Sequence, residues 1–292
     1  SSPRRPELYE PPLVIIPKAP GAERYQPKAF LSSRPLAFSQ SYYGYSCKSH
    51  PDPVTLSALV YLLAHSTLFQ YFALMTSVSQ GADHMIFTKQ DFDSLPFPDF
   101  DALSESTKTE IREIARRLQL DADKPWDELD ALIFQLYGMD ADAVQVARDT
   151  LYASAYYRCA GREAMELTDR NSRAGFRNVL ADELSPYFEV CGQRVEIREV
   201  TTASEAWGQP WFFLSISKQD ETVRLPGSLL SKAMNLANQH GSSRILVRTP
   251  RKTGIAVGLL NQNRWWTATR ARLCAQHIIR EHIEAFGLAE DL

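Results

Sequence analysis

Positively charged side chains crowd the last third of the chain, where they could bind an anion. From Thr222 to Arg280, a stretch of fifty-nine residues, the sequence contains ten Lys and Arg but no Asp or Glu. These ten are Arg224, Lys232, Arg244, Arg248, Arg251, Lys252, Arg264, Arg270, Arg272 and Arg280. So long a run of one sign predicts a surface that binds phosphate groups, with nucleic acid as the first ligand to consider. The alternative is a basic face that docks onto acidic residues 81–149 of the same chain or onto a partner.

One part of this stretch is a basic turn, residues 247–254 (VRTPRKTG), between two apolar runs that are typical of strands. The turn brings Arg248, Arg251 and Lys252 together. Short basic turns between strands clamp backbone phosphates or enter a groove of DNA, so we predict that these three residues bind DNA.

A second phrase, residues 263–272 (NRWWTATRAR), combines two tryptophans with arginines at a predicted helix start. Thr267 suits the N-cap, which places Arg270 and Arg272 in the first turn, where they oppose the helix dipole at a cost of a few tenths of a kcal/mol. An anion at the helix start would offset that conflict, so we predict that Arg264, Arg270 and Arg272 bind DNA. The alternative is that one tryptophan is a core residue and the arginine stems cover it.

Cations and tyrosines also intermingle near the N-terminus, a combination that suits phosphate contact with stacking or groove insertion. The predicted DNA-binding residues of this region are Lys18, Lys28, Arg34, Tyr42, Tyr43, Lys48 and Lys89. Lys89 belongs here because it follows Thr88 at a predicted helix start. The alternative is that the tyrosines are core residues, the cations are solvated, and Thr88 is simply a helix cap.

Catalytic and metal-binding motifs are sparse, and we predict neither a catalytic residue nor a metal site. A metal-dependent nuclease needs clustered carboxylates, whereas Glu196 and Glu199 are spaced to face opposite sides of a strand. The six histidines make no HxxxH motif, and His277 and His282 should lie about 140° apart around a helix. The four cysteines contain no CxxC pair, which predicts reduced thiols in the cytoplasm.

Composition by itself excludes little. The 292 residues are 44% hydrophobic and 23% charged, which is typical of a folded protein and excludes disordered and collagen-like classes. The net charge of −3 seems to disfavour nucleic acid, but it hides a net of +4 over residues 1–50, −9 over 81–149 and +10 over 222–280. The near-neutral total is therefore a cancellation between segments.

A stretch without charged residues, from Pro53 to Ala82, is long enough to cross about 30 Å of hydrocarbon. It contains His65, Gln70 and many Ser and Thr, and its flanks are Asp52 and Asp83 rather than Lys or Arg. We therefore predict one long buried amphipathic helix, ended by Gly81, and no membrane partner.

The periodicity of the rest predicts an α+β protein with three parts. These are a small mixed domain (1–103), a helical spacer (104–183) and a basic α+β domain (184–292). Predicted strands cover 13–17, 41–47, the start of 85–100, two arms of a hairpin around 191–193, 211–217, 244–250 and 254–260. Further predicted helices begin at Thr88 or cover 104–118, 126–137, 140–153, 228–239 and 267–286, with a linker or weak helix over 154–182.

Four phrases in order carry a resemblance to a known family. They are LVIIPKAP, LLAHSTLFQYF, TKQDFDSLPFPDF and WDELDALIFQLYGMDADAVQVARDTL, which together span roughly residues 8–152. This region resembles the part that follows the catalytic domain in adenine-specific DNA methyltransferases of restriction-modification or phage-defence type, and their target-recognition domains. The resemblance implies a region that reads double-stranded DNA and precedes a helical spacer. Residues 184–292 resemble no family that we recognise.

The methyl-transfer motifs of that family are missing from the sequence. An adenine methyltransferase needs an Asn/Asp-Pro-Pro-aromatic loop for the flipped base, whereas the single Pro-Pro here is followed by Leu13. No FxGxG phrase occurs, so we expect S-adenosylmethionine only if a catalytic methyltransferase domain or subunit accompanies this chain. The chain starts with Ser, and we expect a fragment or a processed chain. The rival hypotheses are a protein-assembly module docking an acidic partner through its basic C-terminal domain, and a complete enzyme whose cofactor site escapes motif analysis.

Overall fold

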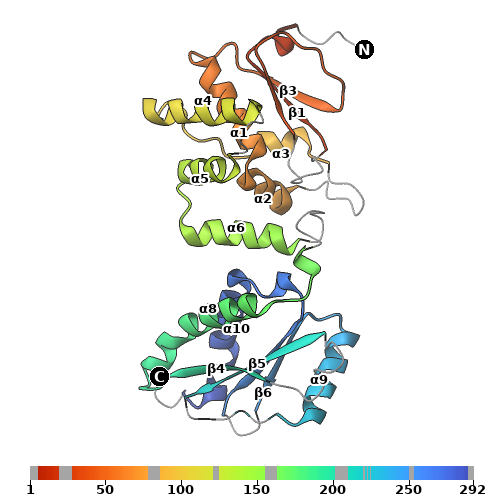
Figure 1. Ribbon diagram of the computed structural model, residues 1–292, viewed down its shortest axis with the longest axis vertical. Coiled ribbons are helices and arrows are strands. Elements are labelled where there is room, and N and C mark those ends of the chain that lie inside the picture. The colour runs from red at the N-terminus through yellow and green to blue at the C-terminus, as the bar shows by residue number, and fades with distance from the viewer. Residues whose placement is uncertain are drawn as a thin grey trace. The chain divides into compact units, whose positions relative to one another are not determined.

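The computed structural model divides the chain into two compact units, Ser1–Gly161 (unit 1) and Arg162–Leu292 (unit 2) (Figure 1). Both combine helices with an antiparallel sheet, so the predicted α+β class is confirmed. The structure describes residues 6–19, 28–77, 86–120, 125–154, 163–200, 210–219, 221, 223, 225–249 and 253–288.

Unit 1 begins with a short 3-10 helix, η1 (Pro6–Tyr9), and a three-stranded antiparallel sheet of order β2-β1-β3. The strands are β1 (Leu13–Pro17), β2 (Phe30–Ser32) and β3 (Tyr42–Ser46). β1 lies in the centre because its four apolar residues, LVII, are all buried. The strands predicted at 13–17 and 41–47 are confirmed.

The predicted long helix is wrong in two respects, because it is broken at Ser66 and ends at Thr76, before Gly81, which lies outside the described residues. α1 (Pro53–His65) and α2 (Thr67–Thr76) meet at an angle of 62°. Ser66 is extended, and its hydroxyl accepts a hydrogen bond from the Phe69 amide at 3.1 Å, so a new N-cap replaces the continuing helix. Of the described helices none alone is long and apolar enough to cross a membrane, and the bent α1–α2 pair passes that test only when combined.

The remaining helices of unit 1 confirm the helical periodicity. They are α3 (Lys89–Asp93), α4 (Glu105–Leu120), α5 (Trp126–Leu136) and α6 (Ala141–Ala153). Thr88 and Asp91 form a capping box at the start of α3, as their spacing predicts. The strand predicted just before Thr88 is wrong in its described part, because residues 86–88 form no ladder and only the Phe87 amide reaches the Lys18 carbonyl, at 2.7 Å.

One hydrophobic core joins the sheet to the helices of unit 1. Val14 of β1, Leu62 of α1, Ile111 of α4 and Ile133 of α5 belong to the same buried cluster. The core therefore spans the division that we predicted at 103/104, and α4 and α5 pack as parts of this unit.

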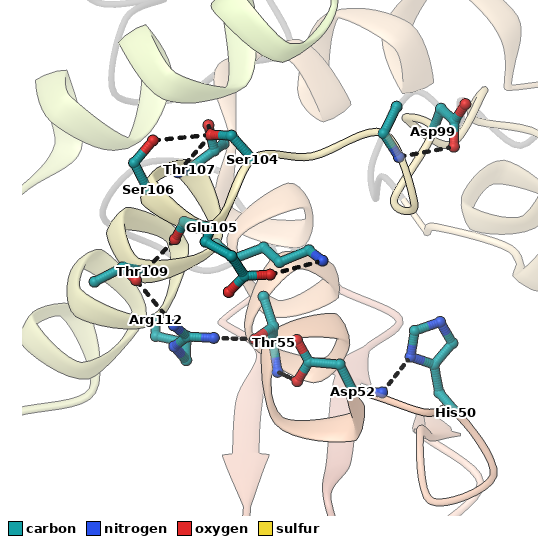
Figure 2. A network of polar contacts seen from close by, with 12 residues as sticks. His50, Asp52, Thr55, Asp99, Ser104, Glu105, Ser106, Thr107, Thr109 and Arg112 are labelled. Atoms are coloured by element: carbon teal, nitrogen blue, oxygen red, sulfur yellow. Dashed lines mark hydrogen bonds and ion pairs between the residues drawn. The ribbon is translucent and has the colours of Figure 1, made fainter.

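A chain of polar contacts ties the start of α1 to α4 (Figure 2). Asp52 caps α1 by accepting from the Thr55 amide at 3.2 Å, and His50 Nδ1 accepts from the Asp52 amide at 3.0 Å. Arg112 of α4 donates to the hydroxyls of Thr55 at 2.7 Å and Thr109 at 2.9 Å. Each of these contacts has a structural role, capping or joining helices.

Unit 2 contains a four-stranded sheet of order β4-β5-β7-β6, in which all neighbours are antiparallel. The elements in chain order are α8 (Arg170–Glu189), β4 (Val195–Val200), β5 (Trp211–Lys218), α9 (Gly227–Gln239), β6 (Arg244–Arg248), β7 (Ile255–Leu260), η3 (Asn263–Trp265), α10 (Ala268–His282) and η4 (Ile283–Phe286). The strands and helices predicted from residue 211 onward are confirmed, except that the closing helix ends in a 3-10 turn.

Helices cover both faces of this sheet (Figure 1). Alternate residues of β5 point to opposite sides, so that Leu214 and Ile216 pack against α8 and α10, whereas Trp211 and Phe213 pack on the side of α9. The result is a layer of two helices, a sheet and a layer of one helix.

The predictions around α8 are partly wrong. Residues 170–189 form one helix of 20 residues, where we expected a linker or weak helix up to 182 and a hairpin arm from 186. Phe176, Leu180, Leu184 and Phe188 recur every fourth residue and are fully buried on the sheet, and this packing outweighs the polar composition around them. The predicted boundary at 183/184 therefore falls inside a helix.

Candidate nucleic-acid interface

The turn between β7 and α10 is held in place by its second tryptophan. The indole of Trp266 is buried and donates to the Leu260 carbonyl at 2.9 Å. Thr267 then caps α10 by accepting from the Arg270 amide at 3.4 Å, as predicted. These contacts fix the start of α10 against the end of β7.

The first tryptophan, Trp265, contacts the side chains of two arginines. The guanidinium carbon of Arg264 lies 5.0 Å from the Trp265 ring centroid, and that of Arg270 lies 4.9 Å from it. Both distances fit a cation–π interaction. Gln262 Oε1 accepts from Arg264 Nε at 3.0 Å and from Trp265 Nε1 at 3.3 Å, which holds the ring and one guanidinium in a fixed arrangement.

A third arginine approaches the same place from the edge strand. Arg244 begins β6 opposite Leu259 of β7, on the same face as Leu246, which packs against the α8–α10 side of the sheet. Burial, and then the positive charges of Arg244 and Arg264, lower the pKa of Arg270. Arg244 and Arg264 therefore each repel the guanidinium of Arg270. Arg244, Arg264 and Arg270 are called the arginine cluster below.

Acidic side chains do not neutralise the arginine cluster within the described part of the chain. None of its three members forms an ion pair with a described Asp or Glu. The other described arginines of unit 2 with a predicted role do form such pairs. Arg272 contacts Glu183 of α8 at 3.3 Å, and Arg248 contacts Glu284 at 3.0 Å.

Arg270 and Arg272, which we predicted to act together, therefore have different partners. Residues two apart on a helix point in nearly opposite directions, so Arg270 turns to Trp265 while Arg272 joins α10 to α8. Arg248 is also occupied, since it donates to His282 Nδ1 at 2.9 Å and to the Glu281 carbonyl at 2.5 Å. Arg251 and Lys252 lie outside the described residues.

The expectation that His277 and His282 face apart is wrong. Their ring centroids are 5.0 Å apart. His282 ends α10 with φ −140°, which is not helical, so the 100° step per residue no longer applies to its side chain. Burial, followed by the charges of Arg248 and His277, lowers the pKa of His282.

A pH dependence of stability follows from this shift. A histidine with a lowered folded-state pKa binds fewer protons in the fold than in the unfolded chain, so its contribution is complete above about pH 6.5 and is lost as the pH falls below that value. We expect the free energy of unfolding to drop less between about pH 7.5 and pH 5.5 in His282→Gln than in wild type, by urea denaturation. His240→Gln, at an exposed histidine, is the control and should keep the wild-type drop. Equal drops in wild type and His282→Gln would contradict the shift.

The predicted residues of unit 1 have local partners instead of forming one cluster. Lys18 Nζ lies 5.0 Å from the Tyr43 ring centroid, and Lys48 forms an ion pair with Glu10 at 2.7 Å. Lys89 pairs with Asp93 and lies 5.5 Å from the Tyr45 ring centroid.

The other predicted residues of unit 1 lie on its surface or pack against neighbouring side chains. Lys28 and Arg34 are exposed, and Tyr42 is half-buried on β3. Tyr43 packs edge-on against Phe92, with ring centroids 6.1 Å apart, so this tyrosine is partly a packing residue. The described part of unit 1 therefore offers dispersed cations, and Lys28 and Arg34 are exposed among them.

Sequence reasoning missed Arg244 as a site residue. It lies twenty residues before Arg264, and only the β6–β7 pairing brings it near the start of α10. The signal that could have found it is the antiparallel connection of 244–250 to 254–260, which returns the chain to its starting end. In the described residues no group of three or more His, Cys, Asp or Glu could hold a metal ion.

No protein-family model matches the chain, and no curated protein matches it. The fold and the site define the class in structural terms. It is an α+β protein of two units, the second of which carries an arginine cluster without acidic partners in the described residues.

Proposed function

We propose that this chain is the DNA-binding, target-recognition module of an adenine-specific DNA methyltransferase-like protein of restriction-modification or phage-defence type. The arginine cluster is the observation that carries the DNA-binding part of this proposal. The resemblance of residues 8–152 supports the assignment to that family. The module acts with a catalytic methyltransferase domain or subunit in the cytoplasm, and S-adenosylmethionine is bound by that partner.

The chemistry of the cluster favours phosphate as its ligand. Guanidinium groups donate several parallel N–H bonds and match the geometry of phosphate oxygens. Binding a phosphate relieves the repulsion of Arg270 by Arg244 and Arg264 and releases counterions from the DNA. A duplex offers such phosphates along its whole length.

The alternative function is a protein-assembly module that docks an acidic partner through its basic C-terminal domain. The contacts of Arg248 with Glu284 and of Arg272 with Glu183 favour it, because arginines of this unit do pair with carboxylates. A carboxylate-rich partner surface would satisfy the arginine cluster in the same way.

Duplex binding should depend steeply on salt. Each phosphate neutralised contributes a slope of about −0.9 to log K against log salt concentration, so three arginines predict a slope of about −2.7 or steeper. Fluorescence anisotropy with a labelled duplex between about 50 and 200 mM salt measures it. Affinity that is indifferent to salt, or no binding at low salt, would contradict DNA binding and leave the assembly function.

A further inference from the structure

The three members of the arginine cluster come from different elements but share one property, an unused set of donors. A guanidinium carries five N–H donors. Among the described residues, Arg264 uses Nε for Gln262, whereas its terminal nitrogens and the side chains of Arg244 and Arg270 have no acceptor. By contrast, Arg248 donates to three acceptors, one of which is Glu284 at 3.0 Å. The unused donors of the cluster therefore come from β6, η3 and the start of α10.

The contacts of Trp265 indicate what kind of group these donors could bind. In a single-strand binding site an exposed ring stacks on a base. Here the ring already contacts two guanidiniums, and its N–H is donated to Gln262 at 3.3 Å. The indole thus orders the arginines and is poorly suited to receive a base. The free donors therefore suit a phosphate group better than a base.

The start of α10 also favours negative charge beside the arginine cluster. Thr267 caps α10, and the positive end of the helix dipole lies beside Arg270. The nearest described carboxylate of α10 in sequence is Glu281, eleven residues beyond Arg270 and about three helical turns away. Along α10, positive charge therefore accumulates at the helix start with no carboxylate of the same helix close to it.

We propose that the arginine cluster binds phosphodiester groups of the DNA backbone and anchors the duplex without reading its sequence. Arg264 and Arg270 are positioned by Trp265, and Arg244 approaches from β6. This inference rests on the proposed function and adds a division of labour to it, in which unit 2 supplies affinity and base readout lies elsewhere. Backbone contacts fix position but carry no direct sequence information.

The test compares Arg270→Ala with Arg280→Ala on a panel of unrelated duplexes, using the full chain. Arg280 is an exposed arginine of the same helix outside the cluster, so it is a control with equal charge change. We expect Arg270→Ala to weaken binding about tenfold on every duplex and to lower the salt slope by about one, and Arg280→Ala to stay within about twofold of wild type. Arg270→Lys keeps the charge but loses the fork of donors and should recover only part of the affinity.

The outcomes separate this inference from the proposed function. Suppose that wild type binds the duplexes and that Arg270→Ala either binds them equally well or loses affinity for one sequence alone. Either result would overturn the anchoring role of the cluster but not DNA binding by the chain. If wild type binds none of them, the proposed function itself fails. Arg244→Ala, on a different element, is a second variant that should repeat the result, and far-ultraviolet circular dichroism checks that each variant is folded.

Discussion

Replacing Gly254 by alanine is expected to lower the free energy of unfolding of unit 2 by at least about 3 kcal/mol, or to prevent its folding. Gly254 has φ +149°, a backbone conformation that L-residues rarely adopt. An added Cβ would lie 2.2 Å from the Ile216 carbonyl oxygen and 2.9 Å from Val223 Cγ2. The carbonyl belongs to β5, which pairs with β7 directly after Gly254, so the clash can be relieved only by opening the centre of the sheet.

Gly175 provides the matched control, because it is a glycine of the same unit and lies inside α8, as the sixth residue of that helix. An added Cβ there meets no atom within 4 Å, and its φ is not positive. Gly175→Ala should therefore stabilise the unit by about 0.5–1 kcal/mol through the lower entropy of the unfolded chain. Urea denaturation of both variants measures the difference. A loss below about 1 kcal/mol for Gly254→Ala would show that the β5–β7 contact yields more easily than this geometry implies.

Local signals in the sequence predicted local structure well. The Thr88–Asp91 capping box and the Thr267 cap each need residues only three positions apart, and both are confirmed. The alternating strands of unit 2 are confirmed for the same reason, since burial on one face leaves a period of two in the sequence.

Structure that depends on distant residues was predicted less well. The arginines and asparagines of 170–178 concealed the apolar stripe of α8, whose stability comes from packing on a sheet formed later in the chain. The grouping of the candidate-site residues also depends on residues that are distant in the sequence. Arg270 and Arg264 were predicted from the phrase around Trp265, but Arg244 joins them through strand pairing. Arg272 is not part of the cluster, because it forms an ion pair with Glu183 of α8.

The break between α1 and α2 also depends on a distant residue, Asp130, which gives the second large prediction. Its carboxylate is buried on α5 and accepts from the Thr67 amide at 2.8 Å and from the Thr67 hydroxyl at 2.5 Å. Thr67 is the first residue of α2, whose free amides need acceptors. Asp130 therefore supplies, from sixty-three positions away, part of the cap that makes a second helix begin.

Asp130→Ala is expected to lower the free energy of unfolding of unit 1 by about 2–3 kcal/mol, because it removes charge-assisted hydrogen bonds and leaves a helix-start amide without its acceptor. Asp130→Asn keeps one carbonyl oxygen for the amide and should cost less, about 1 kcal/mol. Asp127→Ala, at an exposed carboxylate in the first turn of the same helix, should change stability by no more than about 0.5 kcal/mol. Urea denaturation ranks the three variants. Equal losses for Asp130→Ala and Asp127→Ala would mean that Ser66 alone is sufficient to start α2, since its hydroxyl already accepts from the Phe69 amide.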